Sequence, residues 1–542
     1  MMPARKPIVA VVLLITGIGW VINPGVGESF NDEAHKVLST RAINPGLPNA
    51  STLDAYLKNT LQFEFLKGIN ESLLGGQDGT VAGLIRVGAV HEDQGSRPLR
   101  HFHDPTRAWD SAGLFNSVVP PLQSSVVWSQ NPSQSPGGRH SWKDARDAYF
   151  KALTSTTTSL RKAWYAELFR TLGHLIHLVQ DAAVPAHTRN DSHLVDPFLG
   201  LKLDADPFHY WADSPVGLNR INNVAQALRF DPSLLNQSSP NPLAPLPISR
   251  IIDKTDGDIG ILSPNVNIGL AEYSNANFIS KGTARSTNYL YPIYSQLTFS
   301  DVETLPNGKR VRYAKFRPGF GEQDYRVGVS SRMAQFVNAA VPPDSIDFGL
   351  DDSVHEDYGR KLFPRAIGYS AGMIDYFFRG KMDSTELSPT FNWVEWGTQS
   401  NSIRVENVSV KVDGTNERGG QGTMHLVLLF RGTDSGETFP PVIVSEPVSV
   451  NAGSGQTVVF PFSSLPYPAT HPPVYGTYSA LYWGMLVYKG SLGQESEAVV
   501  ADSSCINPTN GSRYRRKYDF QHAIGITLTS GLWQESAYFE GC

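Results

Sequence analysis

The stretch SLRKAWYAELFRTLGHLIHLVQDAAVPAH, residues 159 to 187, decides how the first half of the chain folds. Its apolar residues recur at steps of three and four positions, which is the pattern of a helix with one buried face. Pro185 cannot continue a helix interior, so we expect the helix to end before it. The stretch therefore predicts a long core helix whose buried stripe is formed by Leu160, Trp164, Leu168, Leu172, Ile176 and Val179.

The same helix carries polar residues at a useful spacing. His177 and Asp181 are four positions apart, so their side chains share one face. An imidazole and a carboxylate one turn apart can bind one cation together. A single His–Asp pair on a helix is more often a hydrogen-bonded pair in the core than a metal site. The rest of the region therefore decides between these two interpretations.

Histidine is concentrated in that region, because ten of the 14 histidines fall between residues 35 and 209. The segments FNDEAH, HEDQGSRPLRHFHDP and DPFHYWAD add imidazoles and carboxylates, while the first 500 residues contain no cysteine. Such a donor set fits zinc at a hydrolytic centre, whereas calcium or magnesium would require mostly oxygen ligands. The candidate metal ligands are His35, Glu92, Asp93, His101, His177, Asp181, His187, His193, His209 and Asp213.

In this order the motifs resemble the zinc-dependent phospholipases C and their relatives, the single-strand-specific nucleases. The shared pattern is an early histidine, an aspartate, a histidine in an HF-x-DP setting, His-x3-Asp-x5-His, and then a further histidine and an acid. The chain has His35, HED at 91–93, HFHDP from His101, HLVQDAAVPAH at 177–187, and then His193 and His209. The resemblance covers roughly residues 30 to 213.

The resemblance implies a cluster of two or three zinc ions. One ion would be held by Asp93 (or Glu92), His101, His177 and Asp181. A second would take His187, His193 and a last ligand, for which His209 and Asp213 compete. A third would share Asp181 with His35 and the free amino terminus, although the family's N-terminal tryptophan is absent here and Phe30 stands in its place.

The implied activity is hydrolysis of a phosphate ester by a metal-bound hydroxide, with Asp93 orienting or deprotonating the water. Within the superfamily, the net charge of −5 and an appended β domain favour a phospholipid or similar phosphodiester substrate over nucleic acid. A single-strand-specific nuclease is the alternative enzyme. A non-catalytic exported protein that binds metal or a surface is the alternative from another class.

The start of the chain has the layout of a secretory signal peptide over residues 1–27. Arg5 and Lys6 precede an apolar core, and Gly25 and Gly27 fit a cleavage site. An uncleaved anchor is the alternative interpretation. We therefore expect the protein to be secreted or periplasmic.

The character of the sequence changes after Ser388. Short runs such as HLVLLF, TVVFPF and ALYWGMLVYKG are rich in β-formers and are separated by Gly, Pro, Asn and Ser. The sequence predicts a mainly helical domain over 28–388, with the metal ligands within 30–213, and an all-β, sandwich-like domain over 389–542. The second domain is expected to contact a membrane surface, and Cys505 and Cys542 could form one disulfide.

Overall fold

The computed structural model describes most of the chain from residue 33 to residue 541. The residues not described are 1–32, 63, 116–120, 136–137, 193–205, 240, 258–266, 284–288, 290–291, 293, 332–347, 384–385, 391–400, 432–441, 464–480, 503–513, 517–538 and 542. The expected signal peptide, His193, Cys505 and Cys542 lie outside the described residues.

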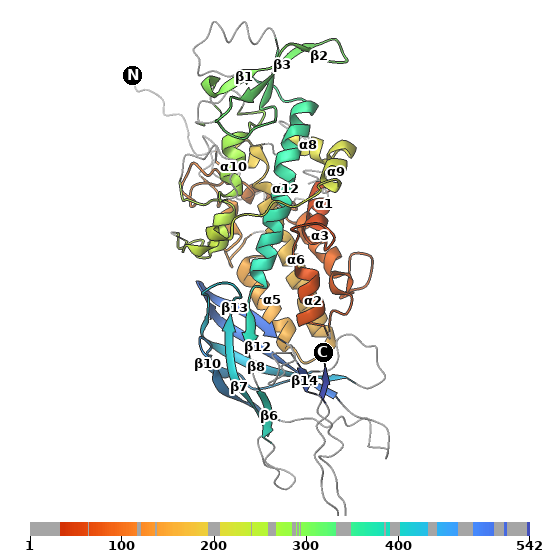
Figure 1. The fold of residues 1–542 in the computed structure, drawn as a ribbon, viewed down its shortest axis with the longest axis vertical. Helices are drawn as coiled ribbons and strands as arrows, with labels where there is room; N and C mark the ends of the chain where they lie inside the picture. Colours follow the sequence, from red (N-terminus) through yellow and green to blue (C-terminus); the bar gives the residue numbers. More distant parts are fainter. Residues whose placement is uncertain are drawn as a thin grey trace, which may run out of the picture.

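The described chain is helical first and then β-rich (Figure 1). This confirms the predicted order of the two structural classes. Among the described helices, none combines the length and the apolarity that crossing a membrane requires. The α-helices are α1 (Glu33–Ala42), α2 (Leu53–Thr60), α3 (Val81–His91), α4 (Ser125–Trp128), α5 (Trp142–Thr154), α6 (Thr158–Asp181), α7 (Pro185–Thr188), α8 (Pro207–Asp213), α9 (Pro215–Asn222), α10 (Leu270–Asn277) and α12 (Asp352–Phe377).

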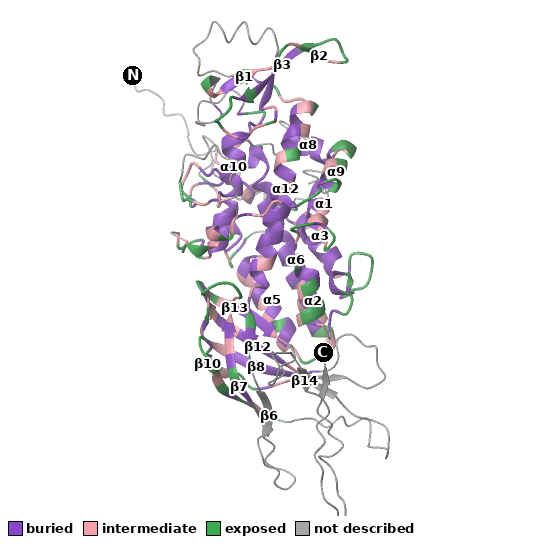
Figure 2. Ribbon diagram, viewed as in Figure 1, coloured by how far each residue is buried: buried purple, intermediate pink, exposed green. Residues whose placement is uncertain are grey.

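The predicted core helix is α6, and it packs against α1, α3, α5 and α12. Its C-terminal half is buried, as Figure 2 shows. The helix ends at Asp181, and Pro185 opens the short helix α7, where its missing N–H is not needed. The predicted stripe is wrong at Leu160, which is 51 % exposed. Leu160 lies in the first turn of α6, where the next residue, Arg161, is fully buried, so the exposed face of this turn carries Leu160.

Two glycines let α3 and α6 approach each other closely. A Cβ atom at Gly88 would lie 1.9 Å from the carbonyl oxygen of Arg170, and one at Gly173 would lie 2.2 Å from that of Ile85. Both distances are far below van der Waals contact with rigid backbone, so only glycine fits at either position. This contact brings the C-terminal end of α3 against the middle of α6.

The second long helix, α12, runs beside α6 and is also mostly buried (Figures 1 and 2). Before it, a small antiparallel sheet is built around β3 (Arg310–Phe316). β3 pairs with β1 (Leu297–Phe299), β2 (Glu303–Thr304) and β4 (Gly328–Ser331).

The C-terminal part consists of antiparallel sheets that begin at Lys381, shortly after α12 ends at Phe377. In one sheet, β12 (Leu481–Leu492) pairs with β8 (Gly419–Arg431) and β13 (Glu495–Asp502), while β8 also pairs with β9 (Val442–Val444) and β10 (Val448–Asn451). In the other, β7 (Asn401–Lys411) pairs with β5 (Lys381–Asp383), β6 (Glu386–Thr390) and β11 (Gln456–Phe462). A further pair joins β14 (Tyr514–Arg516) to β15 (Phe539–Gly541). Residues from both larger sheets share one hydrophobic core.

A buried carboxylate joins the C-terminal sheets to the helices. Glu495 on β13 accepts hydrogen bonds from Trp142 Nε1 at 2.7 Å, Arg146 Nε at 2.7 Å and Arg379 Nη1 at 2.8 Å. Arg146 belongs to α5 and Arg379 follows α12. Two guanidinium groups and an indole therefore converge on one carboxylate that is only 2 % exposed.

Candidate metal centre

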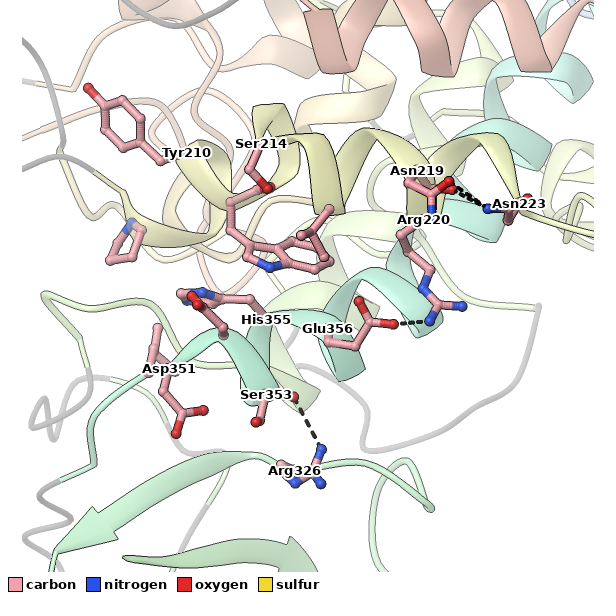
Figure 3. Close-up of a pocket in the computed structure, with 15 residues that line it drawn as sticks. Tyr210, Ser214, Asn219, Arg220, Asn223, Arg326, Asp351, Ser353, His355 and Glu356 are labelled. Atoms are coloured by element: carbon pink, nitrogen blue, oxygen red, sulfur yellow. Dashed lines mark hydrogen bonds and ion pairs between the residues drawn. The ribbon is translucent and has the colours of Figure 1, made fainter. Parts of the chain in front are cut away.

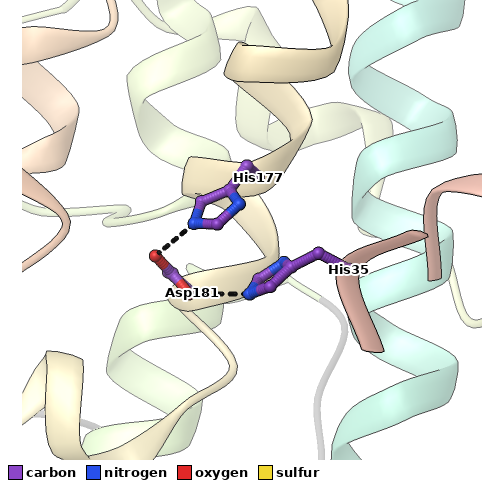
Figure 4. Close-up of side chains that lie close together, drawn as sticks. All are labelled: His35, His177 and Asp181. Carbon is purple, nitrogen blue, oxygen red and sulfur yellow. Dashed lines mark ion pairs between the residues drawn. The ribbon is translucent and has the colours of Figure 1, made fainter. Parts of the chain in front are cut away.

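Four imidazoles surround the carboxylate of Asp181, the fully buried last residue of α6. His101 Nδ1 lies 2.8 Å from Oδ2, His177 Nε2 lies 3.1 Å from it, and His187 Nδ1 lies 3.7 Å from it. His35 Nε2 lies 3.5 Å from the other oxygen, Oδ1 (Figure 4). These side chains come from α1, α6, α7 and the segment after the short 3₁₀ helix η2 (Arg97–Arg100), so the centre is assembled by tertiary packing.

A second carboxylate, that of Asp93, faces the same imidazoles. Its Oδ1 lies 3.4 Å from His101 Nδ1 and 3.6 Å from His177 Nε2. Asp93 directly follows the end of α3, which the glycine contact places against α6. Three overlapping groups have ligand atoms within 4.8 Å of one another, namely His35–His177–Asp181, Asp93–His101–His177 and His101–Asp181–His187.

His209 on α8 lies at the edge of this cluster. Its ring centroid is 5.6 Å from that of His35 and 6.1 Å from that of His187. The sequence left the last ligand of one zinc ion open between His209 and Asp213, and the structure brings His209 beside two of the other predicted ligands.

Two of the cluster imidazoles have a hydrogen-bond acceptor at the nitrogen that faces away from Asp181. His177 Nδ1 lies 2.6 Å from the carbonyl oxygen of Ala89, and His35 Nδ1 lies 2.7 Å from Gln180 Oε1. The amide of Gln180 is itself oriented, since its Nε2 donates to Ser39 Oγ at 3.1 Å. Because these partner oxygens can only accept, both imidazoles carry a proton on Nδ1 and turn Nε2 toward Asp181. Gln180 and Ser39 have no sequence signal that marks them as supports.

The electrostatics of the cluster favour a cation. Burial disfavours the ionised form of Asp181, but the nearby imidazoles, His187 foremost, hold its pKa well below the usual value. Burial also opposes protonation of His177, yet Asp93 and Asp181 raise its pKa to about 10. Neither oxygen of Asp181 accepts a hydrogen bond of normal geometry from the described residues. A buried carboxylate ringed by imidazoles and lacking hydrogen bonds is the arrangement that a metal ion completes.

Two other predicted ligands are placed differently, and a third is not described. Asp213 Oδ1 accepts the backbone N–H of Ala34 at 2.7 Å and so anchors the first turn of α1, next to His35. Glu92 turns to Arg97 and His174, with which it forms ion pairs. His193 lies outside the part of the chain that the structure describes.

The segment that carries His101 is anchored by a second buried carboxylate, Asp253. Its Oδ2 lies 2.9 Å from His103 Nε2 and accepts from Trp109 Nε1 at 2.7 Å. Glu272 on α10 is also fully buried and accepts the backbone N–H groups of Lys254 at 3.1 Å and Gly269 at 2.6 Å. Burial, and then the negative charge of Asp253, raise the pKa of Glu272 to about 8.

We expect this raised pKa to make the protein less stable as the pH rises. Glu272 keeps its proton in the folded state up to about pH 8, whereas the unfolded chain loses it near the ordinary value of 4.5. The free energy of unfolding should therefore fall between about pH 4.5 and 8, by up to about 1.4 kcal/mol for each pH unit. Glu272→Gln should remove this part of the slope in urea denaturation measured at several pH values. Glu303→Gln, at an exposed position on β2, is the control, and equal slopes in the wild type and Glu272→Gln would contradict the expectation.

Two cavities border α8. A small one of about 20 Å³, room for about one water molecule, lies among α1, α6, α8 and α12 and touches His35 and His209. A larger one of about 960 Å³ lies between α8, α9 and the start of α12 and is lined by Tyr210, Trp211 and His355 (Figure 3). His355 is 3 % exposed and neither ring nitrogen has a hydrogen-bond partner among the described residues, while burial lowers its pKa to about 4. The helix α8 thus contributes to both the cluster and this cavity.

Comparison with known proteins finds no family model that matches the chain, and no curated protein matches it either. The resemblance to zinc-dependent phospholipases C therefore rests on the order and spacing of the motifs alone.

Proposed function

We propose that the cluster around Asp181 is a zinc centre. The observation that carries this proposal is the buried Asp181 carboxylate, which has four imidazoles within 3.7 Å and no normal hydrogen bond within the described chain. The donors are imidazole nitrogens and carboxylate oxygens, and the described cluster contains no thiolate. This donor set fits zinc better than calcium or magnesium.

Of the ligands that the resemblance implies, His193 and the amino terminus lie outside the described residues. Asp93, His101, His177 and Asp181 would hold one ion, and His35 with Asp181 would contribute to another. His187 and His209 would belong to a further ion, with Asp213 placed to anchor α1 while it remains a candidate ligand. When bound, zinc would activate a water molecule and stabilise charge on phosphate oxygens.

We further propose that the protein is an exported phosphodiesterase of the phospholipase C type. Asp93 would orient a water molecule or take its proton, since this carboxylate faces the cluster and is more exposed than that of Asp181, at 6 % against 0 %. The motif order and the buried Asp181 support this assignment. The helical region would have the phospholipase C-like fold. The two larger C-terminal sheets would form a β-sandwich that contacts a membrane surface, which the core shared by both sheets supports.

The test combines metal content with substrate turnover on the purified exported protein. We expect two or three zinc ions per chain by elemental analysis, and hydrolysis of a choline phosphodiester presented in vesicles. Removing the metal with a chelator should abolish turnover and lower thermal stability, because a ligand present at 100 times its Kd stabilises the folded state by about 2.7 kcal/mol. Adding zinc back should restore both.

Other outcomes would separate the alternatives. Hydrolysis of single-stranded DNA instead of the lipid would make the protein a nuclease of the same type. Tightly bound zinc with hydrolysis of neither substrate would make it a non-catalytic metal-binding protein. A chain that binds no zinc, even when zinc is added, would overturn the metal centre itself.

A further inference from the structure

Glu92 lies at the centre of a group of buried donors directly behind the cluster. Its Oε2 contacts Arg97 Nε at 2.7 Å, Arg97 Nη2 at 2.6 Å and His174 Nδ1 at 2.5 Å. Its Oε1 accepts from Trp128 Nε1 at 3.1 Å. Glu92 and His174 are both buried, and the ring of His174 stacks on that of His140, which leads toward the surface. With three donors on Oε2, this carboxylate is held in place by residues that do not belong to the cluster.

The other oxygen of Glu92 faces a cluster histidine. Oε1 lies 3.8 Å from His101 Nε2, which has no hydrogen-bond partner among the described residues. The opposite nitrogen, His101 Nδ1, faces Asp181 at 2.8 Å and Asp93 at 3.4 Å. His101 thus turns one nitrogen toward the cluster and the other toward a fixed carboxylate.

His35 and His177 have a similar arrangement, but with a hydrogen bond on the outward nitrogen. Each turns one nitrogen toward Asp181 and gives the other to an acceptor, the Gln180 side chain in one case and the Ala89 carbonyl in the other. Of these three imidazoles, only His101 has its outward acceptor beyond hydrogen-bond distance. The gap of 3.8 Å exceeds a normal hydrogen bond by less than 1 Å, so a small tilt of the ring closes it.

We infer that Glu92 is a positioning residue, whose Oε1 accepts the Nε2–H of His101 and thereby presents Nδ1 to a metal ion. The inference rests on the zinc centre proposed above and assigns a supporting role to a residue that the sequence offered as a possible ligand. An acceptor behind a ligating imidazole fixes its tautomer and raises its basicity. The Glu92 carboxylate would be kept in place by its contacts with Arg97, His174 and Trp128.

The exchange Glu92→Gln tests this role because it places a donor where Oε1 faces His101, although it also removes the acceptor of Trp128 Nε1. The amide oxygen must stay at the Oε2 position, where three donors converge, so the amide NH₂ takes the place of Oε1. The amide N–H then points at His101 Nε2. A donor at this position favours the His101 tautomer with its proton on Nδ1, the nitrogen that a metal would need. The side chain keeps its size, so the packing around it is largely retained.

The matched control is Glu64→Gln. Glu64 is also buried, pairs with the buried Arg161 and accepts the hydroxyl of Tyr165. It lies beside the N-terminal turn of α6, about 30 Å from Asp181 at a rise of 1.5 Å per residue. Both substitutions remove a buried carboxylate paired with arginine, but only Glu92→Gln removes an acceptor that faces the cluster.

We would measure zinc affinity by competition with a chelator, and record the visible spectrum after cobalt(II) is substituted for zinc. The expected result is a loss of zinc affinity of about 10- to 100-fold in Glu92→Gln, with a changed cobalt spectrum, and wild-type values for both in Glu64→Gln. Wild-type affinity and spectrum in Glu92→Gln would overturn the inference while leaving the zinc centre intact. A wild-type chain that binds no zinc would overturn the proposed function as well.

If Glu92→Gln does not fold, a crystal structure of the zinc-loaded wild type decides. A distance from His101 Nε2 to Glu92 Oε1 within hydrogen-bond range, with Nδ1 on zinc, supports the inference. A distance that stays beyond 3.5 Å, or an imidazole turned so that Nε2 binds the metal, overturns it.

Discussion

Replacing Asp181 with asparagine is expected to remove at least one zinc ion per chain and to lower phosphodiester hydrolysis about 1000-fold or more. The carboxylate is shared by four imidazoles and belongs to two of the three candidate ligand groups. Its loss withdraws a negative charge from the point where the candidate sites meet. Metal ions supply several kcal/mol of transition-state stabilisation, and about 4 kcal/mol corresponds to a 1000-fold change in rate.

The measurement is zinc content by elemental analysis beside kcat/KM for the best substrate. Asp54→Asn is a suitable control because Asp54 is also buried and accepts a backbone N–H group, that of Ile69, but lies outside the three candidate ligand groups. The control should retain its zinc even if it is less stable. An Asp181→Asn protein that keeps all its zinc and its activity would show that this carboxylate is not a ligand.

Replacing Glu495 with glutamine should lower the free energy of unfolding by about 3–5 kcal/mol. The substitution leaves the guanidinium groups of Arg146 and Arg379 buried without their counter-charge, at the junction between the helices and the C-terminal sheets. Burial disfavours the ionised form of Glu495, but Arg146 and Arg379 lower its pKa to about 2. The carboxylate therefore contributes stability above the ordinary pKa of 4.5, and this contribution is lost as the pH falls toward 2.

Urea denaturation of the wild type and the variant at neutral pH checks the expectation. Glu497→Gln is the matched control two residues along the same strand, where the carboxylate pairs with Lys143. That pair is 41 % and 46 % exposed, so its loss should cost less than about 1 kcal/mol. Equal free energies of unfolding for the two variants would show that the buried contacts of Glu495 do not hold the junction together.

Much of the secondary structure could be predicted because it depends on local periodicity. The step of three and four residues marked α6, and short runs rich in β-formers marked β8, β11 and β12. The exposure of Leu160 could not be predicted from the stripe, because the periodicity does not show which turns of the helix other elements cover. Glu495 shows a similar limit, since nothing near it in sequence indicates that two distant arginines will enclose it.

The candidate site was partly predictable for the same reason. His177 and Asp181 are one turn apart on a helix, so their proximity follows from local geometry. Gln180 contacts His35 across 145 positions of sequence, and only the packing of α1 on α6 creates that contact. Glu92 and Asp93 are neighbours with the same chemistry, and the sequence left both as possible ligands. The end of α3 turns Asp93 toward the imidazoles and Glu92 toward Arg97.

The close contact of α3 with α6 has a consequence for how proteins of this kind should be sought. Gly88 and Gly173 carry no functional group, yet a single methyl group at either would meet backbone and push the two helices apart. Asp93 would then move away from His177, although every donor atom would still be encoded. A chain that keeps all the histidines but has lost these two glycines should not be assigned the same centre. The absence of two side chains is as informative about this centre as the presence of its ligands.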